Sequence, residues 1–336
     1  MSFEYWYNKN YKKLLIIPAA LLVLSLIYIG IFYGTTGDII NKDVSLTGGT
    51  SITIQTEMSQ ASLNEFISKS LADFEIKSIS DNAGNQLQLI ITVGESDSDE
   101  LELILQDFLG EELTSENSSK ETTSASLSSE FFKQLIVAVI LAFFWMAAVV
   151  FLIFTKNKKA KFYTIVLNVV LGFFMGKMFL NINPIVSGII FLSLSTFLIR
   201  MYIKHSLPAF AVMFSAFADI VMTLAVVNLV GIKLSTAGIV AFLMIIGYSV
   251  DTDILLTTRL LKRKESVNKS LKGAFNTGVT MTVTSIIAVT AALIAVYSFN
   301  SVLNQIFTIL LIGLGFDLFN TWVTNASIIK WHVEKK

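Results

Sequence analysis

Residues 247–253 read GYSVDTD and place two carboxylates, Asp251 and Asp253, at the end of a run that is uncharged from residue 234 onward. The run suits a helix inside a membrane, because about 20 apolar residues are enough to cross a bilayer. A charged side chain in such a helix costs several kcal/mol and therefore marks a functional position by default. The stretch predicts a polar site within a helical membrane protein.

The composition of the whole chain supports this class. Of the 336 residues, 54% are hydrophobic and 15% are charged, which is more apolar than is usual for a soluble domain. The formal net charge is zero, so nothing indicates a nucleic-acid partner. The chain has no cysteine, and no Ser-His-Asp or metal-ligand pattern is visible. We therefore expect neither an enzyme nor a bound metal or cofactor.

Eight apolar stretches are candidates for membrane spans, namely 14–33, 131–154, 163–180, 185–203, 208–230, 234–256, 276–297 and 303–328. Basic residues gather in alternate connections, and 18 of the 25 lie in 8–13, 156–161, 200–205, 259–272 and 330–336. The positive-inside rule then places both termini in the cytoplasm of a cell-membrane protein. The turns NINP (181–184) and SFNS (298–301) would face the other side. Six spans would give the same orientation if 163–180 and 185–203 formed an embedded hairpin.

Residues 34–130 form the one clearly soluble segment, which this topology places outside the cytoplasm. The predicted elements are a strand at 44–57, a helix at 59–74 capped by Ser59, strands at 75–80 and 87–93 around the turn DNAGNQ, a helix at 96–113 and a weak strand at 120–128. The order β-α-β-β-α-β is that of a ferredoxin-like α+β domain. The predicted divisions are 1–33 (tail and first span), 34–130 (extracytoplasmic domain), 131–155 (second span), 156–206 (inserted hairpin) and 207–336 (four-helix bundle and tail).

Polar side chains recur inside the last four spans. Asp219 and Asp317 lie near the middle of spans 208–230 and 303–328. Asp251 and Asp253 differ by about 200° around their helix, so at most one of them faces a given neighbour. Helical spacing groups three further polar stripes, which are Ser215–Asp219–Thr223, Thr277–Thr280–Thr284 and Asp317–Asn320–Thr321–Thr324. The predicted polar core consists of Asp219, Arg259, Asp253, Asp251, Asp317, Ser249, Thr280 and Thr284.

Burial disfavours the charged form of a carboxylate, which allows such a group to exchange protons near neutral pH. We therefore expect a proton relay with Asp219 as its first candidate, and with Asp251 and Asp253 beside Arg259 at its cytoplasmic mouth. The alternative is that the hydroxyl and amide groups only join helices by hydrogen bonds, in a protein with a scaffolding role.

Three motifs resemble the SecF branch of the SecD/SecF family, within the resistance-nodulation-division superfamily, in its archaeal form. DVSLTGGT (43–50) is similar to the family's Asp…Gly-Gly-Thr signature, FADIV (217–221) matches its membrane Asp, and GYSVDTDILLTTRLLKR (247–263) is similar to its Gly-Tyr-Ser motif with a following Arg. The residues that carry these motifs are Asp43, Gly48, Gly49, Thr50, Asp219, Gly247, Tyr248, Ser249 and Arg259. The resemblance covers 1–155 and 207–330, and the family's six spans leave 156–206 as an insertion.

The resemblance implies a function that composition does not. A SecF subunit works with SecD and with the Sec translocon, formed by SecY, SecE and a third subunit. Protons moving down the proton motive force would help to draw an unfolded, exported polypeptide across the membrane. The ferredoxin-like domain would act beside the larger SecD ectodomain, and membrane lipid would surround the spans.

Two other classes remain open. A stand-alone transporter of small molecules or lipids in the same superfamily usually carries two similar halves, whereas this chain has one set of motifs. An intramembrane aspartyl protease would use Asp219 and Asp317. GLGFD (313–317) resembles the GxGD motif of those enzymes, but its spacing differs by one residue and no Pro-Ala-Leu motif occurs.

Overall fold

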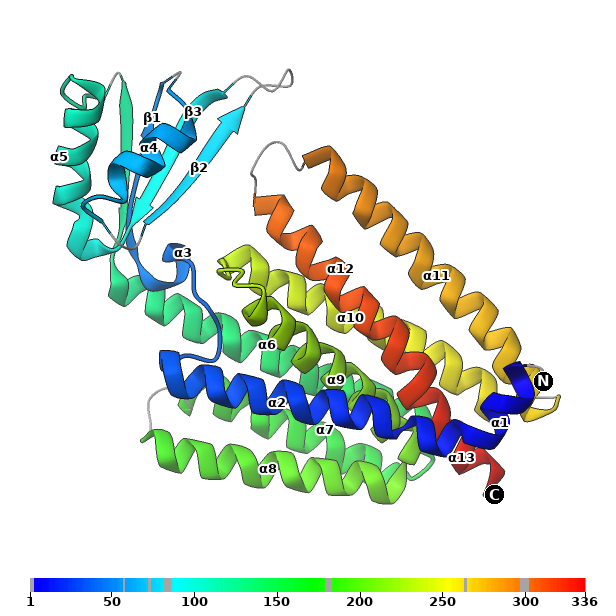
Figure 1. The fold of residues 1–336 in the computed structure, drawn as a ribbon. Coiled ribbons are helices and arrows are strands. Elements are labelled where there is room, and N and C mark those ends of the chain that lie inside the picture. The colour runs from blue at the N-terminus through cyan, green and yellow to red at the C-terminus, as the bar shows by residue number, and fades with distance from the viewer. Residues whose placement is uncertain are drawn as a thin grey trace.

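The computed structural model describes residues 3–56, 58–71, 74–80, 86–115, 117–178, 183–262, 265–296 and 302–335. Within them, eight helices are long and apolar enough to cross a membrane, at Lys9–Thr36, Ala125–Phe154, Lys158–Lys177, Ile185–His205, Leu207–Leu229, Thr236–Leu261, Val267–Val296 and Val302–Glu334. They lie side by side in one bundle, with a small sheet at one end and both termini at the other (Figure 1). We call these the sheet end and the terminal end. Each of the eight predicted spans corresponds to one of these helices. The turn at 298–301, residues 81–85 of the turn at 81–86 and residues 181–182 of the turn at 181–184 lie outside the described residues.

The sheet has the predicted ferredoxin-like topology. Its four antiparallel strands are β1 (Gly49–Ile54), β2 (Phe74–Ser80), β3 (Gln86–Val93) and β4 (Ser118–Thr123), in the order β2-β3-β1-β4. Helices α4 (Gln60–Ile67) and α5 (Ser98–Leu109) share an apolar core with the alternate inward residues of β1 and β3. Ser59 caps α4 as expected, since its hydroxyl accepts a hydrogen bond from the Ser62 N–H at 3.2 Å.

The predicted strand at 44–57 is wrong at its start. Residues Val44–Thr47 form a single helical turn, α3, because the Asp43 carbonyl accepts the N–H groups of Leu46 (2.9 Å) and Thr47 (3.2 Å). Gly48 then adopts a left-handed conformation (φ 84°), which ends the turn and allows β1 to begin at Gly49. A strand pattern does not reveal one closed turn, because the turn depends on the glycine's φ angle.

The helices differ greatly in the fraction of their residues that is buried inside the bundle. Helices α9 (Leu207–Leu229) and α10 (Thr236–Leu261) are the most enclosed, whereas α2 (Ile16–Thr36) and α11 (Val267–Val296) lie at the periphery. Helix α12 (Val302–Asn320) continues through a π-helical turn, η4 (Thr321–Asn325), into α13 (Ala326–Glu334). The bundle thus has a central group, α9, α10 and α12–η4, that is covered by the other helices.

Helices α6 (Ala125–Phe154), α7 (Lys158–Phe173) and α8 (Pro184–His205) form a second group. A second π-helical turn, η2 (Phe174–Met178), extends α7. The α7–α8 hairpin lies on the opposite side of the bundle from α11 (Figure 1). It packs on α6 through the rings of Phe151 and Tyr202, whose centroids are 4.7 Å apart, and through a hydrogen bond of 3.2 Å from the Thr155 hydroxyl to the His205 carbonyl.

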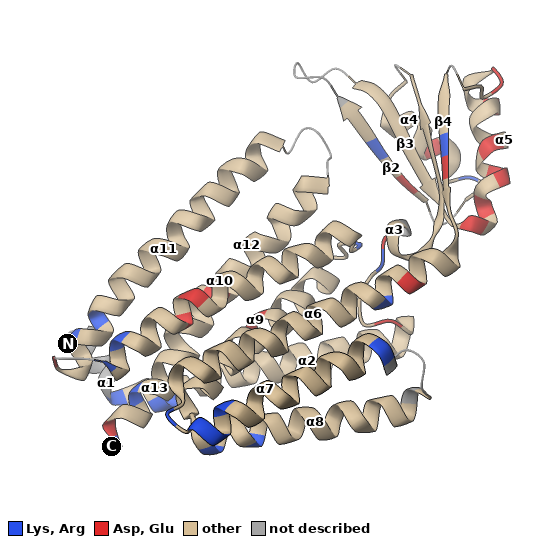
Figure 2. Cartoon of the chain, turned by 180° about the vertical axis from the view of Figure 1, so that it is seen from behind, with Lys and Arg blue, Asp and Glu red and all other residues tan. Residues whose placement is uncertain are grey.

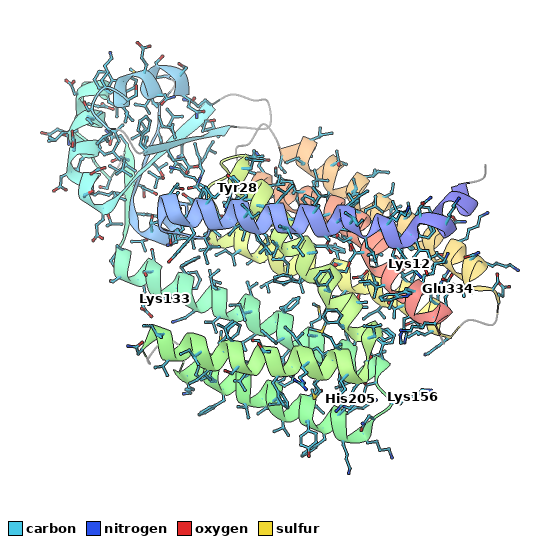
Figure 3. All side chains as sticks on the ribbon, turned by 60° about the horizontal axis from the view of Figure 1, so that its bottom comes forward. Lys12, Tyr28, Lys133, Lys156, His205 and Glu334 are labelled. Atoms are coloured by element: carbon cyan, nitrogen blue, oxygen red, sulfur yellow. The ribbon has the colours of Figure 1, made fainter. Side chains whose placement is uncertain are left out.

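The terminal end is rich in basic residues, and the first and last helices of the chain pack against each other there. Figure 2 shows Lys and Arg gathered there, and Figure 3 places the labelled Lys12, Lys156, His205 and Glu334 at this end. The N-terminal helix α1 (Phe3–Leu14) packs on α13, where the Tyr11 hydroxyl donates a hydrogen bond to Glu334 at 2.6 Å. Lys330 is buried beneath them and lies over the Tyr11 ring at 5.0 Å.

Candidate functional site

Three aspartates from three helices lie in the interior of the central group. Asp219 on α9, Asp253 on α10 and Asp317 on α12 have 0%, 0% and 1% of their surface exposed. We call these three residues and their hydrogen-bond partners the carboxylate network. An ionised carboxylate in such surroundings is costly unless hydrogen bonds compensate for lost water, so the identity of its partners matters.

Asp219 is held from two directions. The Ser249 hydroxyl on α10 donates to Asp219 Oδ2 at 2.6 Å, and the Asn320 amide at the end of α12 donates to Oδ1 at 2.7 Å. The Thr324 hydroxyl donates to the side-chain oxygen of Asn320, Oδ1, at 3.1 Å. This bond fixes the orientation of the Asn320 amide, so that its NH₂ group faces Asp219. One carboxylate therefore joins α9 to both neighbouring helices.

Asp253 and Asp317 share one hydroxyl group. Thr321 Oγ1 lies 2.9 Å from Asp253 Oδ1 and 3.1 Å from Asp317 Oδ1. A hydroxyl has one proton to donate and can accept another, so it can pass a proton between the two carboxyl groups. The Asn325 amide also donates to Asp253 (2.8 Å), and the Thr252 hydroxyl lies 3.2 Å from Asp317 Oδ1.

The helix is irregular where it supplies these partners. Thr321, Thr324 and Asn325 all belong to the π-helical turn η4. Single π-helical turns inside α-helices are rare and occur frequently at functional positions. Here the turn places Thr321 and Asn325 against aspartates and Thr324 against the Asn320 side chain.

Several buried polar atoms around the network lack a hydrogen-bond partner among the described residues. They are Ser215 Oγ, Thr223 Oγ1, Asp253 Oδ2, Asn325 Oδ1 and Ser327 Oγ. Ser215 lies one helical turn from Asp219 toward the terminal end, and Thr223 lies one turn toward the sheet end. Buried polar groups without a protein partner commonly bind water, so these atoms extend the polar interior on both sides of Asp219.

The structure brings together only part of the predicted polar core. Asp219, Ser249, Asp253 and Asp317 meet in the carboxylate network. Asp251 is exposed on the opposite face of α10, as the angle of about 200° between it and Asp253 requires. Gly247 and Tyr248 also face outward.

The other predicted members lie outside the carboxylate network. Arg259 is exposed and donates to the Gly273 carbonyl at 2.7 Å. Thr280 and Thr284 are exposed on α11, and their hydroxyls bond the helix's own carbonyls. The physical reason is that α11 turns its small buried residues, Ala274 and Gly278, toward the bundle.

Two network residues were missed from the sequence, Thr252 and Asn325. Thr252 is three positions after Ser249, a predicted member of the polar core, and Asn325 is four positions after Thr321 in the predicted stripe 317–324, so both share a helix face with predicted residues. A rule that extended each stripe by one turn would have found them.

The fold and the network together define a class: a polytopic helical membrane protein with a ferredoxin-like domain at one end and buried, hydrogen-bonded carboxylates between its central helices. Residues 179–335 match the family described as protein export membrane protein SecD/SecF, C-terminal. The protein-export membrane protein SecF of Methanocaldococcus jannaschii is 36% identical over 332 residues, which cover 97% of this chain and 96% of that protein. The chain belongs to the SecF family of protein-export membrane proteins.

Other relatives and structures agree with this assignment. SecF of Methanolacinia petrolearia is 48% identical over 131 residues, which span 38% of this chain and 46% of that protein. A crystal structure of SecDF, a translocon-associated membrane protein from Thermus, superposes with a TM-score of 0.56 at 16% identity and covers 96% of this chain but 38% of that one. SecDF in its super-membrane-facing form gives a TM-score of 0.50 at 15% identity, with 95% and 38% covered. At these identities the two structures show a shared fold. The small-molecule transporter and protease alternatives are not favoured.

Proposed function

We propose that this chain is the SecF-type subunit of a protein-export complex, in which it works with a SecD subunit at the Sec translocon and uses proton movement to assist an unfolded polypeptide. Family membership supports the export role. The observation that carries proton use is the Thr321 hydroxyl, which lies within hydrogen-bond distance of both Asp253 and Asp317.

Protonation at this position would change how the central helices pack. A proton on Asp317 turns an acceptor into a donor, and the Thr321 hydroxyl must then accept from it and donate toward Asp253. Asp219 holds α9 to α10 and α12 through Ser249 and Asn320, so any change in its charge alters both contacts. A ligand, here the proton, shifts a conformational equilibrium by its differential affinity for the two states.

The charge distribution supports an orientation with both termini in the cytoplasm. Lys and Arg gather at the terminal end, which the positive-inside rule assigns to the cytoplasm (Figure 2). The sheet end, with the ferredoxin-like domain, then faces the outside, where an emerging polypeptide and a SecD ectodomain would be met. Protons moving inward would enter near Thr223 and leave past Ser215 and Ser327.

The test is secretion of a reporter protein from cells that carry Asp219→Asn, with and without a protonophore, and with the membrane level of the protein checked by blot. We expect normal levels, reduced secretion and loss of the protonophore-sensitive part. Unchanged secretion with unchanged protonophore sensitivity would exclude Asp219 from proton use.

A further inference from the structure

The motif DVSLTGGT (43–50), which begins with Asp43, lies far from the carboxylate network. The segment that leads into it nevertheless lies at the ends of the network helices. After α2, residues 39–43 lie beside the loop between α9 and α10. The two segments pair through backbone hydrogen bonds, as two short strands would. The Leu234 N–H donates to the Asn41 carbonyl (2.6 Å), and the Asp43 N–H donates to the Leu234 carbonyl (2.9 Å). The side chains of Ile40 and Leu234 are both buried in the apolar cluster at this end of the bundle.

The same strand-like pair is fixed to α9 by one asparagine. Asn228, in the last turn of α9, donates its amide to the Ile39 carbonyl at 2.9 Å and accepts from the Asn41 N–H at 3.3 Å. Because Asn228 lies nine residues from Asp219, the two are about 14 Å apart along one continuous helix.

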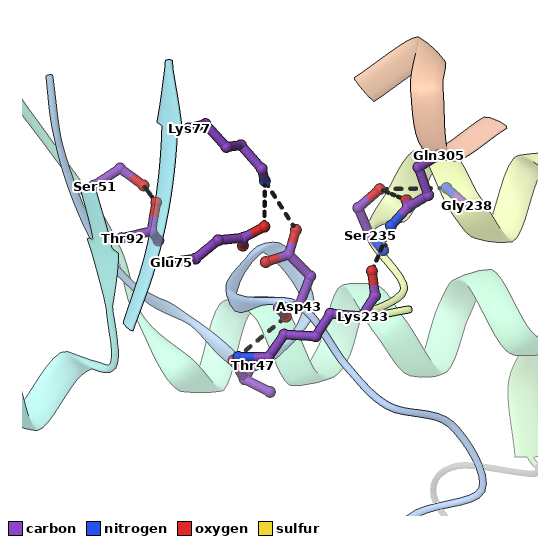
Figure 4. Close-up of polar contacts among 10 residues, drawn as sticks. All are labelled: Asp43, Thr47, Ser51, Glu75, Lys77, Thr92, Lys233, Ser235, Gly238 and Gln305. Atoms are coloured by element: carbon purple, nitrogen blue, oxygen red, sulfur yellow. Dashed lines mark hydrogen bonds and ion pairs between the residues drawn. The ribbon is translucent and has the colours of Figure 1, made fainter. Parts of the chain in front are cut away.

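Helices α10 and α12 meet at this end through Gln305. Its side-chain amide donates to the Lys233 carbonyl, and its oxygen accepts from both the N–H and the hydroxyl of Ser235, the residue that caps α10 (Figure 4). Gln305 therefore ties α12 to the loop between α9 and α10, and this loop pairs in turn with residues 39–43. The three helices joined in this way are the ones that carry the buried aspartates.

Asp43 connects this segment to the extracytoplasmic sheet. It is 7% exposed, and its Oδ2 lies 3.9 Å from the Lys77 ammonium on β2, which also pairs with Glu75 at 3.2 Å (Figure 4). Asp43 thus contacts the bundle through its backbone and the sheet through its side chain.

Gly48 allows a close contact between the start of the sheet domain and the start of α6. A Cβ atom at this position would lie 2.4 Å from the Ala125 Cα at the start of α6, so only glycine lets the chain pass there. The N–H of the same Ala125 also donates to Glu95 at 3.1 Å. The domain therefore sits on α6 and is linked to the carboxylate helices through Asp43.

We propose that Asp43 is a positioning residue that fixes the ferredoxin-like domain to the sheet ends of α9, α10 and α12, so that rearrangement at the carboxylate network moves the domain. Asn228 joins α9 to residues 39–43, Leu234 joins the α9–α10 loop to them, and Gln305 joins α12 to that loop. The proposal gives the Asp43…Gly48 motif a mechanical role, and its importance for export rests on the function proposed above.

The experiment measures the distance between domain and bundle directly. The chain has no cysteine, so spin labels can be placed at Leu103→Cys on α5 and Val240→Cys on α10, both exposed positions. The full-length protein is studied in lipid nanodiscs. We expect a narrow distance distribution that broadens in Asp43→Asn and in Lys77→Gln, and that stays narrow in the conservative variant Lys77→Arg.

A matched control is Lys120→Gln, which removes the 2.7 Å ion pair between Lys120 and Glu102 within the same domain. This variant should leave the distribution unchanged. Unchanged distributions in both Asp43→Asn and Lys77→Gln would overturn the proposal. Normal, protonophore-sensitive secretion from Asp219→Asn, alongside a broadened Asp43→Asn distribution, would exclude Asp219 from proton use and leave the positioning role intact.

Secretion gives the second readout. Lys77→Gln should reduce reporter export, Lys77→Arg should restore it, and Lys120→Gln should match the parent. Equal secretion from Lys77→Gln and Lys77→Arg, with the domain displaced only in the former, would show that domain position has no bearing on export and would overturn the mechanical role.

Discussion

Ser249 on α10 donates a hydrogen bond of 2.6 Å to Asp219 on α9, 30 positions earlier in the chain. Ser249 belongs to the Gly-Tyr-Ser motif, and Asp219 belongs to the motif FADIV (217–221). Two short motifs that look independent in sequence are therefore one contact in space. Asn320 completes the site from α12, so three helices meet at a single carboxylate.

Asp253 and Asp251 provide a matched pair on one helix. Asp253→Asn should reduce protonophore-sensitive secretion, because an amide cannot exchange a proton as the Asp253 carboxyl group can, and Thr321 and Asn325 donate hydrogen bonds to that carboxyl group. Asp251→Asn should secrete normally, because Asp251 is exposed on the other face. Equal losses in the two variants would show that position on the helix face is irrelevant and would contradict the assigned network.

Asn320→Leu should destabilise the bundle. The variant keeps a side chain of similar size but leaves a buried oxygen of Asp219 and the Thr324 hydroxyl without their partner, at a cost of about 1–3 kcal/mol. Thermal unfolding in detergent measures the change. Asn276→Leu, the same substitution at an exposed position on α11, should stay within about 0.5 kcal/mol of the parent.

Gly313 sets the distance between α12 and α10. A Cβ atom there would lie 2.4 Å from Ile245 Cδ1, so Gly313→Ala should cost about 1–3 kcal/mol through overpacking. Gly315, two residues later, has no neighbouring atom within 4 Å, and Gly315→Ala should gain up to about 1 kcal/mol from helix propensity. Unfolding midpoints that shift alike in both variants would refute the close contact.

Comparing Gly48→Ala with Gly37→Ala separates the cost of a left-handed backbone conformation from the cost of a steric clash. Both glycines have a left-handed φ, 84° and 78°, which costs an alanine about 1–2 kcal/mol. Only Gly48 also faces a backbone atom at 2.4 Å, on Ala125. We expect Gly48→Ala to lose secretion and domain stability while Gly37→Ala shows the smaller, purely conformational loss. Similar losses at both positions would mean that the contact with Ala125 is unimportant.

The domain should be more stable at low pH because of Glu75. Burial, and then the neighbouring Asp43 carboxylate, raises the pKa of Glu75 above its ordinary 4.5, while Lys77 opposes the shift. The folded state therefore binds this proton more tightly than the unfolded state does. The resulting stabilisation is complete below pH 4.5 and is lost as the pH rises through the pKa of the folded state.

Hydrogen exchange of β2 and β3 in the full-length protein, corrected for intrinsic exchange rates, measures this effect. Protection should fall with rising pH in the parent and fall less in Glu75→Gln, which keeps a neutral side chain throughout. An identical pH dependence in the two proteins would rule out Glu75 as its source.

The sequence by itself determined the elements and their class. Apolar length predicted the eight spans, and alternating patterns with turn residues predicted the strand order of the ferredoxin-like sheet. Helical spacing also showed that Asp219, Ser215 and Thr223 share a face, and that Asp251 and Asp253 do not. These properties depend on residues near one another in the chain, so they can be read locally.

Tertiary structure decided which faces meet. Spacing gives the angle of a side chain around its own helix but not the neighbour toward which that helix turns. For this reason Thr280 and Thr284, as polar as Thr321, lie outside the network, while Thr321 lies between two carboxylates. The tie between the Asp43 segment and the helix ends depends in the same way on contacts such as Asn41–Asn228, 187 residues apart, and Ser235–Gln305, 70 residues apart, which only packing brings together.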